Sequence, residues 1–170
     1  MENIAKELLS LAQSIPPESL ERCAAQLASH ERIFVCGAGR SGLMLKALAM
    51  RLMQLGKTAY AAGETTTPAI GPGDLLVAAS ASGSTPSVCR NVRIALDCGS
   101  DVMILTARSH SPLTELHPAD LLQPAPTKDE PGVQLMGSLF EQGLLLVCDT
   151  LVSRLPYDAD AMRMRHANLE

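Results

Sequence analysis

Hydrophobic residues along the chain alternate between helical spacing and short continuous runs. Helical spacing over 1–31, interrupted by Pro16 and Pro17, predicts two helices, because proline is accepted in the first turn of a helix. Short apolar runs further along predict five strands, of which the last is weak. These strands are expected at 32–36, 58–62, 75–80, 102–106 and 121–122.

Further helices are predicted between the strands and after the last of them. Leucines spaced three and four residues apart mark a helix over 41–55, and another helix begins at Pro86. A single helical turn is expected at 112–116, and the longest helix at 135–155. The segment 123–133 contains three prolines and a glycine, which predicts a loop.

The alternation of strands and helices predicts one α/β domain that spans 1–170. Such an alternation forms right-handed βαβ units around a parallel sheet. The run at 75–80 does not alternate polar and apolar residues, so both of its faces should be buried. Ligands of parallel sheets bind beyond the carboxyl ends of the strands. The loops after 32–36 and 75–80 are therefore the first places to look for a site.

Composition narrows the range of partners. The chain has 170 residues and a mass of 18.0 kDa, and only 2% of its residues are aromatic. So few aromatic rings disfavour single-stranded nucleic acid, and a net charge of −4 offers no basic surface to duplex phosphates. No uninterrupted apolar run reaches the roughly 18 residues of a membrane span. Neither a nucleic acid nor a membrane is expected as a partner.

The N-terminus and the cysteines indicate the cytoplasm. The first ten residues lack the basic and apolar regions of a signal peptide. The five cysteines are odd in number and scattered without a C-x-x-C pair, which is typical of reduced thiols. The four histidines show no metal-ligand spacing either, so no metal site is expected.

The first loop has two interpretations. Residues 37–42 read GAGRSG between a predicted strand and a predicted helix, which is the context of a dinucleotide-binding loop. Glu64 follows about 20 residues later, where an acid would bind a ribose. Alternatively, the glycines only allow the strand and the helix to pack closely. The shortness of the chain, which leaves no room for a substrate domain, weakens the dinucleotide interpretation.

The second loop is rich in hydroxyl groups. Five of the eight residues in 80–87 carry a hydroxyl, and a predicted helix follows. Hydroxyl donors beside the free amides of a helix N-terminus suit a terminal phosphate group. A plain helix cap would also be rich in serine and threonine. The position of this loop at the carboxyl end of a buried strand favours phosphate binding.

Glu141 is an acidic residue near the start of a very apolar helix. Partial burial would raise its pKa toward the working range of a general base. The alternative is an exposed first-turn acid that complements the helix dipole. His166 is of interest only because it lies in the polar tail 156–170, in which a short helix can form.

Together these segments closely resemble the 6-phospho-3-hexuloisomerases, small members of the SIS (sugar isomerase) fold. The most specific matches are GETTTPAI at 63–70, GSLFEQ at 137–142 and RHANLE at 165–170. GAGRSGL at 37–43 and the serine-rich loop add to them. The resemblance implies a three-layer, flavodoxin-like fold with a five-stranded parallel sheet, preceded by two N-terminal helices.

The resemblance also implies an activity and a set of site residues. The reaction would convert D-arabino-hex-3-ulose 6-phosphate to D-fructose 6-phosphate, in formaldehyde fixation by the ribulose monophosphate pathway, without a cofactor. A homotetramer with shared active sites is implied, in which Glu141 is the base and His166 reaches a neighbour's site. The residues implied to bind the phosphosugar are Gly39, Ser41, Glu64, Ser80, Ser82 and Thr85.

One position departs from the family pattern. The family loop commonly reads Ser-Gly-Glu-Thr, whereas Ser84 replaces the acidic residue here. The hydroxyl positions remain, so phosphate binding is retained while any role of the missing acid is in doubt. Three other functions stay open: a different aldose–ketose phosphosugar isomerase, a non-catalytic phosphosugar-binding SIS module, and a dinucleotide-binding protein.

Overall fold

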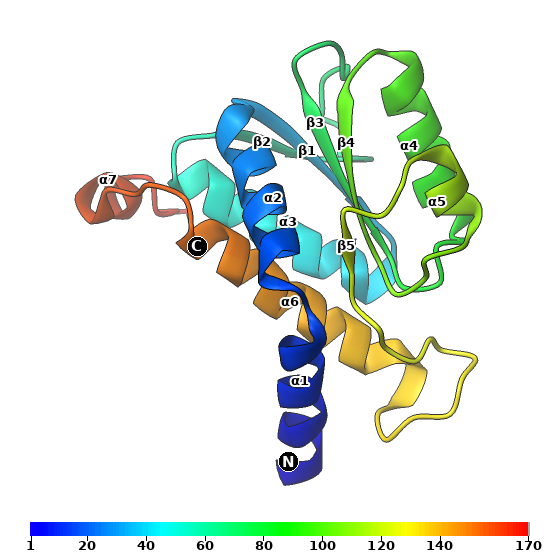
Figure 1. Cartoon of the computed structure of the whole chain (residues 1–170). Helices are drawn as coiled ribbons and strands as arrows, with labels where there is room; N and C mark the ends of the chain where they lie inside the picture. The colour runs from blue at the N-terminus through cyan, green and yellow to red at the C-terminus, as the bar shows by residue number, and fades with distance from the viewer. Residues whose placement is uncertain (170) are drawn as a thin grey trace.

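The strands and helices alternate along the chain in the computed structural model, which describes residues 1–169 (Figure 1). Two helices, α1 (Glu2–Ser14) and α2 (Pro17–Ser29), precede the sheet, as predicted. The strands are β1 (Arg32–Gly37), β2 (Thr58–Ala61), β3 (Leu75–Ser80), β4 (Asp101–Thr106) and β5 (Leu121–Leu122). The later helices are α3 (Gly39–Gln54), α4 (Pro86–Asp97), α5 (Pro112–Leu116), α6 (Ser138–Ser153) and α7 (Ala159–Met164).

All five strands are parallel and lie in the order β2-β1-β3-β4-β5. This is the flavodoxin-like order, and it confirms the predicted five-stranded α/β sheet. From β1 the chain first moves outward to β2 and then returns to β3 on the other side of β1. The carboxyl ends of β1 and β3 therefore form the switch point at which ligands of open parallel sheets bind.

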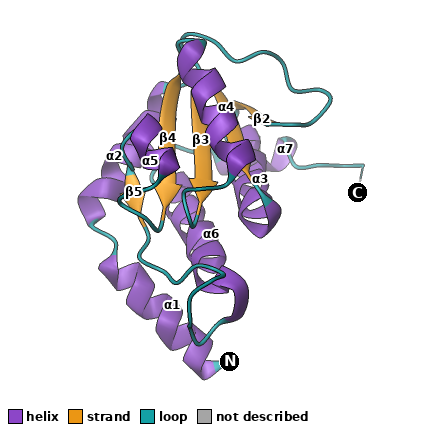
Figure 2. Cartoon of the chain, turned by 90° about the vertical axis from the view of Figure 1, so that its right-hand side faces the viewer, coloured by secondary structure: helices purple, strands orange, loops and turns teal. Residues whose placement is uncertain are grey.

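Helices cover both faces of the sheet, which gives three layers (Figure 2). On one face, Val35, Val77 and Met103 pack with apolar residues of α1, α2, α3 and α6. On the other face, Phe34 and Ile104 belong to a smaller core with α4 and α5. Every residue of β3 is buried, as its non-alternating sequence predicts.

The predicted helix over 135–155 is interrupted near its start. Leu135–Gly137 form a short 3₁₀ turn, and α6 begins only at Ser138. The backbone φ angles of Met136 and Gly137 are 58° and 78°, and this left-handed conformation cannot continue an α-helix. The break turns the preceding loop back toward the carboxyl edge of the sheet.

The segment Leu135–Ser153 is long and apolar enough to cross a membrane by length and composition, with a mean hydropathy of 1.4 over 18 residues. The sequence predicts no membrane span because no uninterrupted apolar run is long enough, whereas the hydropathy criterion allows two charged residues in its 18-residue window. The fold explains part of its apolar character, because Phe140, Leu144, Val147 and Leu151 are buried in the core against one face of the sheet. A core helix of this kind passes the same test as a membrane span.

Candidate active site

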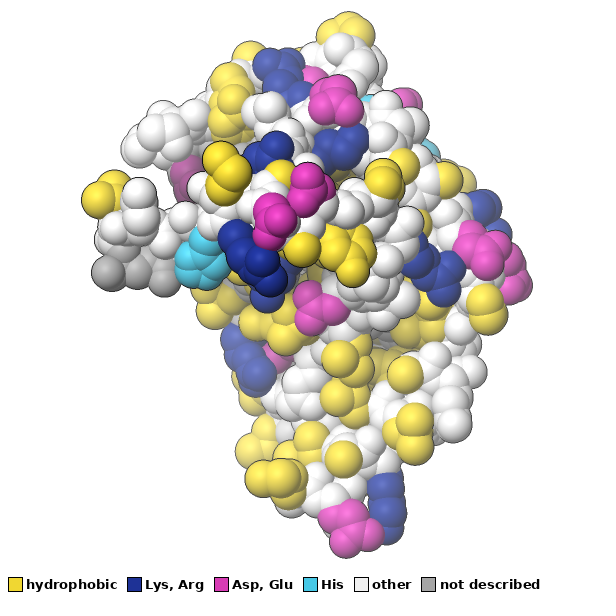
Figure 3. Space-filling model, turned by 90° about the vertical axis from the view of Figure 1, so that its left-hand side faces the viewer, with side chains coloured by type: hydrophobic (Ala, Val, Ile, Leu, Met, Phe, Trp, Pro, Cys, Tyr) yellow, Lys and Arg dark blue, Asp and Glu magenta, His cyan; other side chains and the backbone are white. Residues whose placement is uncertain are grey.

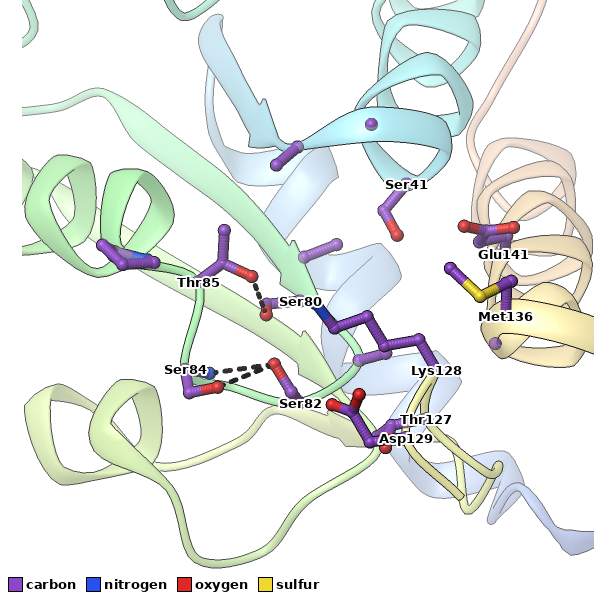
Figure 4. Close-up of a pocket in the computed structure, with 16 residues that line it drawn as sticks. Ser41, Ser80, Ser82, Ser84, Thr85, Thr127, Lys128, Asp129, Met136 and Glu141 are labelled. Atoms are coloured by element: carbon purple, nitrogen blue, oxygen red, sulfur yellow. Dashed lines mark hydrogen bonds between the residues drawn. The ribbon is translucent and has the colours of Figure 1, made fainter. Parts of the chain in front are cut away.

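A cleft of about 530 Å³ lies beyond the carboxyl ends of β1 and β3 (Figure 4). Three segments line it: the turn into α3, the loop between β3 and α4, and the segment that leads into α6. Polar side chains from all three segments line the cleft. These residues are Ser41, Ser80, Ser82, Ser84, Thr85, Thr127, Lys128, Asp129 and Glu141.

The glycines of the first loop bring strand and helix into close contact. A Cβ atom on Gly42 would lie 2.7 Å from the carbonyl oxygen of Gly37, so a side chain there would collide with the backbone. Gly39 has a φ of 56° and begins α3 in a left-handed conformation. The resulting turn places Ser41 in the first turn of α3, where its side chain lines the cleft. Close packing at Gly37 and Gly42 and the left-handed backbone at Gly39 thus account for the glycine pattern.

The second loop arranges its hydroxyl groups around a left-handed glycine. Gly83 has a φ of 64°, and its amide donates a hydrogen bond of 3.2 Å to Ser80 Oγ. Ser80 Oγ and Thr85 Oγ1 lie 2.9 Å apart, and Ser84 Oγ donates to Ser82 Oγ at 2.9 Å. A Cβ atom on Gly83 would collide with the side chain of Ser111, so only glycine fits this position.

The serine-rich loop leads directly into the N-terminus of α4. Thr85 is the N-cap residue, and its side chain makes no capping hydrogen bond. The first amides of α4 therefore keep their donor capacity at the edge of the cleft, where the helix dipole is positive. Hydroxyl groups and helix amides thus form a cradle of neutral hydrogen-bond donors beside the cleft.

Glu141 lies across the cleft from this cradle, in the first turn of α6 (Figure 4). Its side chain is 16% exposed, and Arg40 Nε approaches its Oε2 atom at 3.1 Å. The approach has the distance of an ion pair but not the angle of a hydrogen bond, so Oε2 has no hydrogen-bond partner among residues 1–169. Arg40 itself is held by a hydrogen bond of 3.1 Å from its Nη1 to Ser138 Oγ.

Burial raises the pKa of the Glu141 carboxyl above its ordinary value, and the positive charge of Arg40 partly opposes this shift. A raised pKa makes a partly buried carboxylate a stronger base than an ordinary exposed one, which suits a general base. Of the two interpretations of Glu141, the structure shows the partly buried one, together with a cationic neighbour that neither interpretation includes.

The third wall of the cleft was missed in the sequence analysis. Thr127, Lys128 and Asp129 come from the segment that was predicted only as a loop, and Met136 from the break before α6. This segment has no periodicity, and its prolines indicated irregular backbone without indicating where that backbone runs. The sole available signal was its place after β5, which ends at the same edge of the sheet as β1 and β3.

Two of the predicted site residues lie outside the cleft. Glu64 forms an ion pair of 2.9 Å with Lys46 and lines a separate cavity of about 330 Å³ beside α4. His166 is exposed just after α7, and its Nδ1 atom lies 3.0 Å from the carbonyl oxygen of Ala167. The cleft thus brings together Gly39, Ser41, Ser80, Ser82, Thr85 and Glu141, but neither Glu64 nor His166.

The tail that carries His166 is attached at the opposite end of α3 from the cleft. Arg165 Nη1 donates a hydrogen bond of 3.2 Å to the carbonyl oxygen of Gln54, the last residue of α3. A helix of 16 residues spans about 24 Å. Within one chain, the cleft therefore lies at the carboxyl ends of the strands, and His166 lies near their amino ends.

Comparisons with known proteins agree with the fold and identify the family. The family model of the SIS domain matches residues 26–149. The chain is 41% identical to 3-hexulose-6-phosphate isomerase of Mycobacterium gastri, over 98% of this chain and 88% of the relative. It is 38% identical to the Bacillus subtilis (strain 168) protein of the same name, over 98% of this chain and 95% of the relative.

Two solved structures are similar over nearly the whole chain. One is a Methanococcus jannaschii protein whose structure was used to infer the function of a 3-hexulose-6-phosphate isomerase, with a TM-score of 0.84 and 29% identity. That match covers 98% of this chain and 97% of the other. The second is the Vibrio vulnificus NanR protein complexed with ManNAc-6P, with a TM-score of 0.76 and 28% identity. It covers 96% of this chain but 63% of the other.

Proposed function

Because the chain belongs to the SIS-domain family and, within it, to the 3-hexulose-6-phosphate isomerases, we propose that it isomerises D-arabino-hex-3-ulose 6-phosphate to D-fructose 6-phosphate. This reaction is the second step of formaldehyde fixation in the ribulose monophosphate pathway. The observation that carries the proposal is one cleft with a hydroxyl-lined cradle on one side and a partly buried carboxylate on the other.

We assign the sugar phosphate to the serine-rich loop. Ser80, Ser82 and Thr85 supply hydroxyl donors, and the amides at the start of α4 add the positive end of the helix dipole. Gly39 and Ser41 face the same space from the turn into α3. Ser84 replaces an acid with another hydroxyl, which avoids placing a negative charge beside the phosphate.

The reaction moves a carbonyl group from C3 of the sugar to C2. A base removes the hydrogen on C2, the electron pair forms a 2,3-enediolate, and the hydroxyl proton passes from the C2 oxygen to the C3 oxygen. Return of a proton to C3 completes the ketose. We assign the carbon–proton transfers to Glu141, because its raised pKa suits both removal and return of a proton.

We propose that Glu64 and His166 act at the site of a neighbouring copy in a homotetramer. Glu64 lines a cavity other than the cleft, and the tail that carries His166 is held at the last residue of α3, which supports this assignment. Large apolar side chains are exposed on α1, α3 and α6, and Figure 3 shows hydrophobic groups over the lower part of one face. These exposed residues include Ile4, Leu9, Leu43, Met50 and Leu146. Such surfaces are typical of contacts between subunits.

We place the protein in the cytoplasm. All five cysteines are free thiols, and Cys23 and Cys148 are fully buried where their pKa is raised to about 12. Thiols kept in this form are typical of a reducing compartment.

A direct assay of carbonyl transfer tests the proposed function. Purified protein is mixed with D-fructose 6-phosphate, and the 3-ulose is followed by ¹³C NMR from carbon-labelled sugar. We expect formation of the 3-ulose with wild-type protein and a loss of about 10²–10⁴-fold in rate with Glu141→Gln. The Glu115→Gln variant, on the exposed face of α5, is the matched control and should retain full activity.

Thermal unfolding shows whether Glu141→Gln loses activity because the base is missing or because the fold is damaged. The folded state raises the pKa of Glu141, so ionisation of this carboxyl at neutral pH disfavours folding, and this cost disappears at low pH. Glu141→Gln should therefore unfold at the wild-type temperature or above it. Normal turnover of Glu141→Gln would refute the catalytic assignment, and an inactive wild-type protein that binds the sugar phosphate would indicate a non-catalytic SIS module.

A further inference from the structure

The charges that line the cleft are unequal in number. Among the residues described, Glu141 and Asp129 contribute carboxylates to its wall, whereas Lys128 is the single basic side chain that lines it. Arg40 lies just outside the lining and is engaged by Glu141 and Ser138. A doubly charged phosphate entering this cleft would meet two acidic groups and mainly neutral donors. A free positive charge near the cradle would therefore favour phosphate binding.

Lys128 can supply this positive charge, because its side chain is exposed and forms no ion pair within residues 1–169. In Figure 4 the side chain extends from the third wall of the cleft toward the serine-rich loop, with its amino group at the Ser80 end. Both Lys128 and Ser80 line the same cavity. The ammonium group is thus directed at the place where the phosphate cradle lies.

The backbone around Lys128 is fastened in a defined turn. Glu130 accepts a hydrogen bond of 2.7 Å from the amide of Thr127, and its own amide donates one of 3.1 Å to the Thr127 carbonyl. The Glu130 carboxylate also forms an ion pair with Arg108. Lys128 lies inside this turn, between the two residues that close it.

Arg108 joins the turn to the sheet. It follows β4 by two residues, and its amide donates a hydrogen bond of 3.3 Å to Thr106 Oγ1. The neighbouring amide of Ala107 donates one of 3.2 Å to the carbonyl oxygen of Ala81, in the serine-rich loop. The same short segment therefore contacts the phosphate cradle and holds the turn that carries Lys128.

We infer that Lys128 binds the phosphate group of the substrate, and that the Arg108–Glu130 ion pair positions Lys128 over the cradle. The inference rests on the proposed function in that it assigns the same cleft to a phosphosugar. It adds the charged partner that the hydroxyl groups and helix amides lack. Lys128 contacts substrate directly, whereas Arg108 and Glu130 act as positioning residues.

Inorganic phosphate is the probe that tests Lys128 without relying on catalysis. Its dissociation constant is measured by calorimetry for wild type, Lys128→Met and Lys128→Arg, and the KM for D-fructose 6-phosphate is measured alongside. Lys128→Met should raise both the dissociation constant of phosphate and the KM by about 10- to 100-fold, because hydrogen bonds to charged groups are strong. Turnover at saturation should change little, since the lost contact is the same in the ground state and the transition state.

The control variants make the result specific. Lys128→Arg keeps the charge and should restore most of the phosphate affinity. Arg93→Met removes a charge from the exposed face of α4, outside the cleft, and should bind phosphate as wild type does. Equal phosphate affinity in wild type and Lys128→Met overturns the inference, whatever the isomerase assay gives. Weaker phosphate binding in Lys128→Met by a protein without isomerase activity supports the inference and refutes the proposed function.

A double-mutant cycle tests the positioning role of Glu130. Glu130→Gln should raise the dissociation constant of phosphate by at least about twofold in the wild-type background. It should have no effect in the Lys128→Met background, because there is then no ammonium group to position. Equal effects in the two backgrounds would show that Glu130 acts only on the fold, and would overturn its assignment as a positioning residue.

Discussion

At the scale of single residues, two environments act on the pKa of Glu141 in opposite directions. Burial raises the pKa and Arg40 lowers it, with burial the larger effect. A base must be deprotonated to act, so kcat/KM should fall as the pH drops through this pKa. The acid limb of the pH–rate profile is therefore expected above the ordinary glutamate value of about 4.3.

Replacing Arg40 tests this balance. Arg40→Met removes the charge that lowers the pKa of Glu141, so the acid limb of kcat/KM should move to higher pH. The measurement is the pH dependence of kcat/KM for D-fructose 6-phosphate, with Arg93→Met as the control for loss of a distant charge. An acid limb that stays in place in Arg40→Met would mean that Glu141 is not the group that titrates.

Some site residues could be found from the sequence and others could not. Glu141 and the serine-rich loop stood next to strongly periodic segments, so their positions relative to the sheet were predictable. Arg40 and Lys128 gave no such signal, because a basic residue in a turn or an irregular loop has no periodicity. Arg40 forms an ion pair with Glu141, and Lys128 lines the same cavity as the serine-rich loop, and in both cases the partner is far away in the sequence.

At the scale of elements, the junction between β1 and α3 depends on contact between two glycines. Gly42→Ala would place its Cβ 2.7 Å from the carbonyl oxygen of Gly37, which forces the backbone to move. We expect this variant to lose about 1–3 kcal/mol of unfolding free energy, as in other overpacked sites. Chemical denaturation followed by circular dichroism measures the loss.

Gly71→Ala is the matched control for that substitution. A Cβ atom on Gly71 would have no neighbour within 4 Å, and its φ lies outside the left-handed region. Its stability should equal that of wild type or exceed it slightly, because alanine restricts the unfolded chain. Equal losses in the two variants would contradict the account of the β1–α3 junction.

The order of elements was largely predictable because most of them are strongly periodic. Even the weak strand at 121–122 and the single turn at 112–116 occur as predicted. The break at Met136 and Gly137 was not predictable, since the residues around it fit a helix and tertiary contacts decide where the helix begins. The course of the loop before it follows from Glu130 contacts that no local pattern contains.

At the scale of the whole molecule, we propose that each active site is shared between two subunits. Glu141 lines the cleft of its own chain, whereas His166 is fastened near the far end of α3. A homotetramer that shares its sites would bring His166 of one copy to the cleft of another. Size-exclusion chromatography with light scattering should give the mass of four 18.0 kDa chains.

Mixing two inactive variants tests whether the sites are shared. Glu141→Gln and His166→Ala are each expected to have low activity. Subunit exchange between them should restore roughly a quarter of wild-type turnover, because randomly paired sites regain both groups with that frequency. Mixtures with no more activity than the separate variants would show that His166 does not serve a neighbour's cleft.

Hydrogen exchange tests most directly whether a 2,3-enediolate forms in the cleft with Glu141 as the base. D-Fructose 6-phosphate is incubated with the protein in deuterated water without added cofactor, and the position of the label is read by NMR. We predict deuterium at C3, formed at a rate that falls about 10²–10⁴-fold in Glu141→Gln. Deuterium at C1 would indicate an aldose–ketose isomerase instead, and an unlabelled, unconverted sugar would contradict the proposed enzyme.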